Sequence, residues 1–431
     1  MMKGSPVVVI SLALVALVLL SGCTQPTSLA TVQTPPTLTA VLTGTPARSP
    51  QPTVAGVITP DLKPVASFES GQRYKAGPYD VIVLSGSYRE MGRQYGGLMK
   101  DEFSAEYAFL INTLTQRGYT KAQVLAIAKG DNSGRPQFLE EITAGMSETS
   151  GLTSDDLAIL YDGGILYMYY NGPTKSSCSF LTTWGDYTKD GSVIVSRNLD
   201  LMDSMSAFNP YYVLAVYRPN DGSRGVATFG PAGMRPETLM NSAGLFIADD
   251  AVIFPYPNQH DNSRPPLVAE FFRMMLSDST TSRLDVDIQA TRPDTAYIVD
   301  AAGPDQAYVY EETIADTKQR TGTGLIAASN HFIDPAWHLS GKPDDGNSVA
   351  RYNSLVSAAE KSKGLIDAAT MMQIRDVLYR NGGATFLRDD LGGEKYSTIH
   401  QVVFVPKTRT LWMKVMGNNW QQVELGPLFG P

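Results

Sequence analysis

Cysteine is scarce in this chain, which has only two, Cys23 and Cys178, among 431 residues. Cys23 closes the apolar leader at Leu20-Ser21-Gly22-Cys23, whereas Cys178 lies between a helix-like first half and a strand-rich second half. Surroundings this different do not predict a disulfide between the two. A single cysteine in an exported domain instead indicates a reactive thiol. We interpret Cys23 as a lipid attachment site and Cys178 as a nucleophile.

Other features are also sparse. The net charge is −8, and charges of both signs are spread along the chain, which argues against nucleic acid or an anionic membrane surface as the main partner. No metal-ligand spacing, glycine-rich phosphate loop or nucleotide fingerprint stands out, so we predict neither a metal nor a cofactor. We find no internal repeat.

The N-terminal segment has the layout of an export signal. Lys3 precedes an apolar run from Val7 to Leu20, followed by small residues, which predicts a signal peptide over residues 1–22. Cysteine directly after Leu-Ser-Gly resembles the lipobox of prokaryotic lipoproteins, which implies acylation of Cys23 and an extracytoplasmic, membrane-anchored protein. The alternative is an ordinary secreted protein. Residues 23–63, rich in Thr and Pro, predict a disordered spacer.

Residues 64–431 are expected to form the globular part, with a helical region over 64–177 and a strand-rich region over 178–431. Apolar residues at helical spacing predict helices over 88–117, 120–128, 136–146 and 154–169, the last with Ser154 as N-cap. Runs rich in Val, Ile, Tyr and Phe predict strands over 79–84, 192–197, 211–217, 225–229, 245–248, 296–300, 307–310, 399–405 and 411–415. Further helices are expected over 266–276, 281–290, 349–361 and 367–378. Antiparallel strands with helices in blocks indicate an α+β fold of packed sheets covered by helices.

A nucleophilic cysteine needs a group that takes its proton. Histidine is the usual partner, and His331 and His338 lie in a loop-rich stretch that leaves a Cys–His pair open. The other solution is cleavage before Cys178, which makes its own α-amine the general base. An α-amine has a pKa of about 7.7–8.0, close to working pH.

The motifs around these residues resemble those of the N-terminal nucleophile hydrolases. The resemblance is to the branch with the acyl-coenzyme A:6-aminopenicillanic acid acyltransferases, which is related to bile salt hydrolases and penicillin V acylases. It is carried by the Gly86, Gly92 and Gly96 spacing, and by Cys178 followed by Arg197-Asn198-Leu199-Asp200. Further segments are Asn241-Ser242-Ala243-Gly244-Leu245, Ser329-Asn330-His331-Phe332 and Ser348-Val349-Ala350-Arg351. The resemblance implies a four-layer αββα sandwich.

The resemblance also implies a role for each matching residue. Cys178 is the nucleophile, the charge of Arg197 favours its thiolate, and Asp200 holds the α-amine. Asn241 lends a main-chain donor, and Asn330 a side-chain amide, to the oxyanion. Arg351 supports the charge network. His331 is interpreted as a scaffold residue rather than a base.

These inferences predict an amidohydrolase that exposes Cys178 by cutting its own Ser177–Cys178 bond and then cleaves a linear, non-peptide or small-peptide amide. The alternatives on the same fold are a phospholipase-B-like or ceramidase-like acyl hydrolase, or an acyltransferase. A surface solute-binding lipoprotein with an inert Cys178 is the alternative from another class, and it would have two α/β lobes.

Overall fold

The computed structural model describes residues 62–169, 177–252, 261, 263–339 and 347–430. The predicted signal peptide, Cys23 and nearly all of the predicted spacer therefore lie outside the described residues. No helix in the described ranges has both the length and the apolar character needed to cross a membrane.

The first part of the chain pairs a small antiparallel meander with a run of helices. The strands are β1 (Pro64–Phe68), β2 (Gly71–Ala76) and β3 (Tyr79–Gly86). The helices are α1 (Tyr88–Leu98), α2 (Lys100–Gln116), α3 (Lys121–Asp131), α4 (Gln137–Thr149), α5 (Ser154–Tyr161) and α6 (Gly163–Tyr169).

Two helix predictions in this region need correction. The stretch expected as one helix over 88–117 is two helices that meet at Met99, which has a non-helical φ of −120°. The stretch over 154–169 is likewise divided into α5 and α6. Thr153, not Ser154, is the N-cap of α5, because its hydroxyl accepts from the Asp156 N–H in a capping box.

The second part supplies most of the strands. They are β4 (Ser179–Gly185), β5 (Gly191–Met202), β6 (Tyr212–Pro219), β7 (Val226–Pro231), β8 (Thr238–Asn241), β9 (Phe246–Ala251), β10 (Tyr297–Ala302), β11 (Ala307–Glu312), β12 (Thr317–Thr321), β13 (Leu325–Ala328), β14 (Leu387–Asp390), β15 (Lys395–Val405), β16 (Thr410–Val415) and β17 (Gln421–Glu424). The helical elements are η1 (Asp203–Tyr211), α7 (Leu267–Ser277), α8 (Thr281–Ala290), η2 (Pro335–Trp337), α9 (Asn347–Lys361), α10 (Ala368–Asp376), η3 (Tyr379–Asn381) and α11 (Leu425–Leu428).

These strands form two sheets. One has the order β1-β2-β3-β6-β7-β8-β9-β10-β11-β12, and the other has the order β13-β4-β5-β15-β16-β17 with β14 beside β15. The strand pairs are antiparallel except β3 with β6, which are parallel. Side chains from both sheets pack in a shared core, to which Phe180 and Val195 contribute from the smaller sheet and Phe246 and Val309 from the larger.

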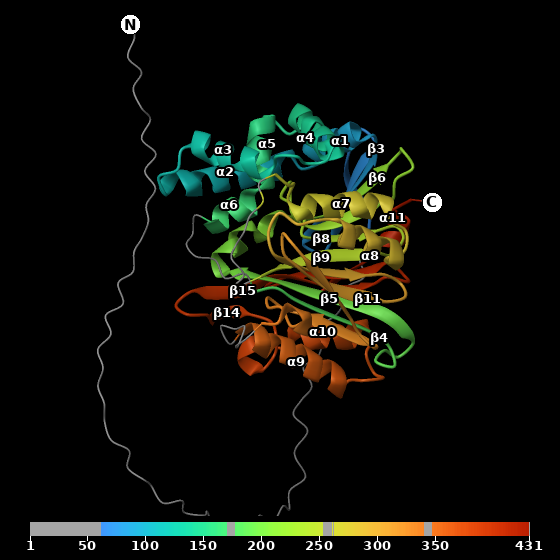
Figure 1. Cartoon of the computed structure of the whole chain (residues 1–431). Helices are drawn as coiled ribbons and strands as arrows, with labels where there is room; N and C mark the ends of the chain where they lie inside the picture. The colour runs from blue at the N-terminus through green and yellow to red at the C-terminus, as the bar shows by residue number, and fades with distance from the viewer. Residues whose placement is uncertain (1–61, 170–176, 253–260, 262, 340–346, 431) are drawn as a thin grey trace, which may run out of the picture. The chain divides into compact units, whose positions relative to one another are not determined.

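Helices cover both outer faces (Figure 1). The outer face of the larger sheet packs against α1, α4 and α7, and the outer face of the smaller sheet packs against α9 and α10. The predicted α+β class and four-layer αββα sandwich are therefore confirmed. The described residues do not form the two α/β lobes expected of a solute-binding protein.

The glycine motif of the first helix has a packing role. A methyl group at Gly92 would lie 2.1 Å from the Ile142 carbonyl oxygen, and one at Gly145 would lie 2.1 Å from the Arg89 carbonyl oxygen. These distances are far inside van der Waals contact. The absence of side chains at these positions therefore allows α1 and α4 to approach backbone to backbone.

We expect Gly92→Ala to lower the free energy of unfolding by about 1–3 kcal/mol, because α1 and α4 must separate. Urea unfolding in a Cys178→Ala background measures this without interference from self-cleavage. Gly130→Ala is the matched control, because Gly130 is also helical and a methyl group there meets nothing within 4 Å. It should stabilise by about 0.5–1 kcal/mol. Equal effects of the two changes would contradict the close-packing role.

Candidate active site

Cys178 is buried at the start of β4, between the two sheets. Its side chain is 2% exposed and belongs to the inter-sheet core. The register pairs Ser179 with Asn198 and Phe180 with Arg197, so Cys178 lies across from Leu199. The main-chain N–H of Ser177 donates to the Asp200 carbonyl oxygen at 3.1 Å. Strand pairing alone thus brings the Ser177–Cys178 bond beside the Arg-Asn-Leu-Asp segment.

Arg197 extends from β5 across the inter-sheet space. Its guanidinium donates to the Thr238 hydroxyl at 3.0 Å and to the Asp249 carbonyl oxygen, and it lies 3.8 Å from the Asp250 carboxylate. Burial raises the pKa of the Cys178 thiol far above its usual value, and the Arg197 charge offsets part of that rise. Arg197 thus acts in the predicted direction, but the thiol of the intact chain is neutral.

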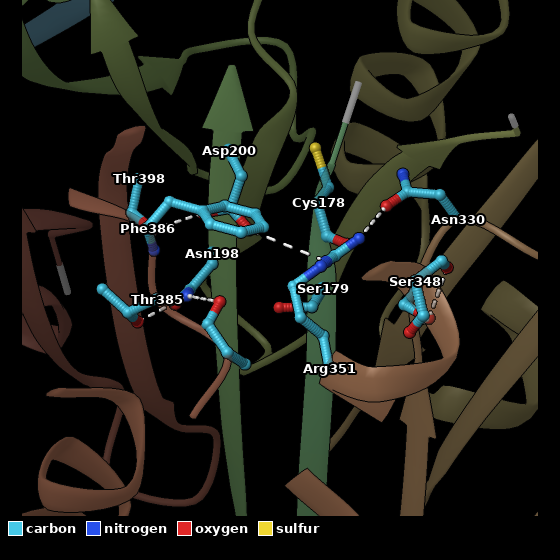
Figure 2. Close-up of polar contacts among 12 residues, drawn as sticks. Cys178, Ser179, Asn198, Asp200, Asn330, Ser348, Arg351, Thr385, Phe386 and Thr398 are labelled. Carbon is cyan, nitrogen blue, oxygen red and sulfur yellow. Dashed lines mark hydrogen bonds and ion pairs between the residues drawn. The ribbon is translucent and has the colours of Figure 1, made fainter. Parts of the chain in front are cut away.

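Arg351 joins several predicted residues into one network. It enters from α9, is fully buried, and donates to the Cys178 carbonyl oxygen at 2.6 Å and to Asn330 Oδ1 at 2.7 Å. Its Nε donates to Asn347 Oδ1 at 2.7 Å, and Nη1 lies 3.7 Å from Asp200 Oδ2. Figure 2 shows the guanidinium between Cys178 and Asn330.

Asp200 occupies the helix-facing side of β5, next to this guanidinium. The Thr398 hydroxyl donates to Oδ1, whereas Oδ2 is buried without a hydrogen-bond partner among the described residues. Burial raises the pKa of Asp200 to about 7, against the lowering effects of Arg351 and Thr398. The carboxyl group can therefore accept one more donor at Oδ2.

The Asn330 side-chain amide is fixed at both ends. Its Oδ1 accepts from Arg351, and its Nδ2 donates to the Ala251 carbonyl oxygen at 2.7 Å. Nδ2 carries two hydrogens, and this contact uses one of them. The orientation is compatible with the predicted donor role of Asn330.

Asn241 lies in the β8–β9 hairpin. Its main-chain N–H donates to the Leu245 carbonyl oxygen at 3.0 Å, inside the β8–β9 hairpin. Its side chain accepts from the Ala243 and Leu245 N–H groups and donates to the Met275 and Asp278 carbonyl oxygens. In the intact chain the hairpin uses this N–H group, and the role of Asn241 as a main-chain donor to the oxyanion stays a prediction.

Two histidines are held by hydroxyl groups. His331 Nδ1 lies 2.7 Å from Ser348 Oγ and 3.2 Å from Ser329 Oγ. His400 Nδ1 lies 3.0 Å from the Tyr212 hydroxyl, and burial together with Arg197 lowers its pKa well below the usual value. These contacts fit a scaffold role for His331 and a neutral His400.

Sequence reasoning missed several buried charges around the nucleophile. Asp250 and Asp300 point into the inter-sheet space from β9 and β10, and neither carboxylate has a hydrogen-bond partner among the described residues. Arg375 of α10 lies under β4 and β5 and donates to the Ser179 and Ser196 hydroxyls. Two adjacent aspartates in the apolar run Phe-Ile-Ala-Asp-Asp were the available signal for Asp250. The described residues contain no group of His, Cys, Asp and Glu able to hold a metal ion.

Comparison with known proteins gives the following results. No family model matches the chain, and no curated protein matches it by sequence. Among solved structures it is similar to a variant of the conjugated bile acid hydrolase from Clostridium perfringens, with 12% identity, 59% of this chain and 94% of that chain covered, and a TM-score of 0.42. The Caenorhabditis elegans N-acylethanolamine-hydrolyzing acid amidase ortholog gives 13% identity, 53% and 93% coverage, and a TM-score of 0.40. Penicillin V acylase from Agrobacterium tumefaciens gives 12% identity, 58% and 87% coverage, and a TM-score of 0.41.

These neighbours are N-terminal nucleophile hydrolases, the class that the sequence motifs resemble. Because the TM-scores lie below 0.5, the function of this chain must be argued from its own residues.

The buried carboxyl groups predict how stability depends on pH. Burial raises the pKa of Asp250 to about 6 and that of Asp200 to about 7, whereas an aspartate in an unfolded chain has a pKa of about 3.9. Between these values the folded chain binds more protons than the unfolded chain. Stability is therefore greatest below about pH 4 for these groups and is lost as pH rises towards 7.

We expect the uncut Cys178→Ala chain to need more urea for unfolding at pH 5 than at pH 7.5. Adding Asp250→Asn should reduce this difference, because one titrating group is removed. Adding Asp155→Asn, at a side chain that is 49% exposed on α5, should leave it unchanged. Equal unfolding midpoints at the two pH values would contradict the buried-carboxylate account.

Proposed function

We propose that this chain is an extracytoplasmic lipoprotein amidohydrolase whose nucleophile is the N-terminal Cys178 of a self-cleaved precursor. The observation that carries the proposal is the position of the Arg351 guanidinium. It contacts the Cys178 carbonyl oxygen, the Asn330 amide and the Asp200 carboxylate, next to the Ser177–Cys178 bond. The lipid anchor at Cys23 rests on the sequence alone.

The first step of the proposed reaction is self-cleavage. The Cys178 sulfur attacks the Ser177 carbonyl carbon and transfers its proton to the departing Cys178 nitrogen, which leaves a thioester between Ser177 and Cys178. Water then hydrolyses the thioester, giving a Ser177 carboxylate and a free Cys178 α-amine. Asp200 Oδ2 is a buried acceptor beside this bond, and an α-ammonium group can occupy it.

The second step uses the new α-amine as general base. It takes the thiol proton, the thiolate adds to the substrate carbonyl, and the amine part leaves with a proton from the α-ammonium. The Asn330 amide is the side-chain donor to the oxyanion, and loss of such a donor costs about 2.7–4 kcal/mol in other hydrolases. Hydrolysis of the acyl-enzyme by water completes the cycle.

We expect the chain from Pro64 onward to separate into two fragments, the second beginning Cys178-Ser179-Phe180 and containing residues 178–431, 254 in all. Intact mass and N-terminal sequencing measure this, and Cys178→Ala should remain whole. Cleavage of the alanine variant at the same bond would show an external protease instead. A wild-type chain that stays uncut would refute the α-amine mechanism.

We expect Arg351→Lys to slow self-cleavage about tenfold or more, because an ammonium group cannot reproduce the planar contacts with Cys178 and Asn330. The fraction of cut chain over time, read by mass, measures this. Arg135→Lys is the control, since that side chain is also only 3% exposed but pairs with Glu140, outside the Arg351 network. Equal rates of self-cleavage in the two variants would show that Arg351 has no special role in the reaction.

A further inference from the structure

A pocket opens on the same inter-sheet face as Cys178. It lies between α6, η1 and the strands β5, β6 and β15 and is partly open to solvent. Its wall is mainly apolar and includes Met168, Leu199, Met205, Phe208 and Ile399. Since Leu199 is the residue across from Cys178, the pocket reaches the immediate surroundings of the thiol.

Besides Tyr161 and Tyr212, three polar side chains line this pocket, and two of them already have partners. Arg235 pairs with Asp131 and Asp162. His400 is held by the Tyr212 hydroxyl at 3.0 Å, and burial keeps its ring neutral by lowering its pKa. Neither group offers a free charge to a ligand.

Glu237 is the third polar side chain, and it differs from the other two. It directly precedes β8, and its side chain is 26% exposed. Within the described ranges its ion pair is with Arg197, at the long distance of 3.9 Å. Arg197 also donates to Thr238 and Asp249, so its charge is shared. A carboxylate thus lies on the pocket wall with much of its hydrogen-bonding capacity unused.

Two arginine charges, those of Arg197 and Arg235, offset part of the rise that burial causes in the pKa of Glu237. Three arginines lie around Cys178, namely Arg197, Arg351 and Arg375. Asp250 and Asp300 also face the inter-sheet space, and burial raises the pKa of both carboxyl groups. An anionic ligand group entering this pocket loses water and meets the like charge of the Glu237 carboxylate, whereas a cationic group meets its opposite charge in a poorly solvated site.

We propose that Glu237 is the specificity-determining residue of this pocket, which binds an apolar substrate group bearing an ammonium and rejects one bearing a carboxylate. The substrate class would then be a hydrophobic amide with a cationic end. This identification of a substrate rests on the proposed function of Cys178, but the binding preference itself can be measured without any hydrolysis.

The test uses octylamine, 1-octanol and octanoate, which share one apolar chain and differ in charge. Titration calorimetry on the full-chain protein at pH 7.5 should give octylamine a dissociation constant about tenfold lower than that of octanoate, with 1-octanol between them. Glu237→Gln should bring octylamine and octanoate within about twofold of each other. Glu148→Gln, which neutralises a side chain of almost the same exposure, 27%, on α4, should preserve the wild-type order. Circular dichroism checks that each variant is folded.

Three binding outcomes overturn the pocket proposal. Equal binding of octylamine and octanoate to the wild type removes the charge preference, and an unchanged preference in Glu237→Gln places it at another residue. No binding of any of the three probes shows that the pocket does not take an apolar chain. A chain that binds octylamine yet cleaves no amide would contradict the proposed function and leave the pocket preference intact. Amide hydrolysis without a preference for octylamine would support the proposed function and contradict the pocket preference.

Discussion

The site depends on one buried guanidinium. Arg351 is fully enclosed, and removing an arginine from water is costly unless its donors are satisfied and its charge is compensated. Its partners meet this requirement with two amide oxygens, one main-chain oxygen and the Asp200 carboxylate. They come from the start of α9, the residues just after β13, the residue just before β4 and the C-terminal end of β5. The position of Arg351 therefore depends on all four segments. The Arg351 side chain in turn contacts each of them.

This arrangement leaves an imbalance of charge around Cys178. The buried carboxylates outnumber the arginines, and both oxygens of Asp250 and Asp300 lack hydrogen-bond partners among the described residues. Burial accordingly raises the pKa of Asp200, Asp249 and Asp250 to about 7, 8 and 6. Under the proposed mechanism, cleavage gives a Ser177 carboxylate and a Cys178 α-ammonium, and the ammonium forms beside these acids. The intact chain thus has buried acceptors for a cation that forms only after the Ser177–Cys178 bond breaks.

The sequence predicted those parts of the fold that leave a local pattern. Helical spacing located α3, α4 and α7 to α10 to within a few residues, and apolar runs located the long central strands. The strands that were missed are β1, β2, β4, β8, β12, β13, β14 and β17. Six of these eight strands have only four or five residues, which carry too little alternation. The division at Met99 was also missed, since both helices continue the same apolar spacing. It depends on how α1 packs against α4 and β3.

The site was predictable to a similar degree. Cys178, Arg197 and Asp200 are close in sequence, and Asn330 and Arg351 sit in short motifs, so a resemblance could identify them. Asn241 sits in an equally clear motif, yet its hydrogen bonds serve the β8–β9 hairpin. A motif cannot distinguish a residue that builds a turn from one that faces a substrate. Asp250, Asp300, Glu237 and Arg375 converge from separate elements, and only the packing of the two sheets brings them together.

The alternation of side chains along β4 and β5 explains why the two functions proposed for Cys178 do not obstruct each other. Cys178, Arg197 and Leu199 face the inter-sheet space, where the pocket lies. Ser179 and Asp200 face the helix layer, where Arg375, Arg351 and Thr398 bind them. The thiol can therefore meet a substrate on one side of the sheet while Asp200 secures the main-chain nitrogen from the other. Because the side-chain period of a strand is two, a shift of one residue in the β4–β5 register would reverse both assignments. The long pairing of β5 with β4 and β15 is thus part of the active-site geometry as well as of the fold.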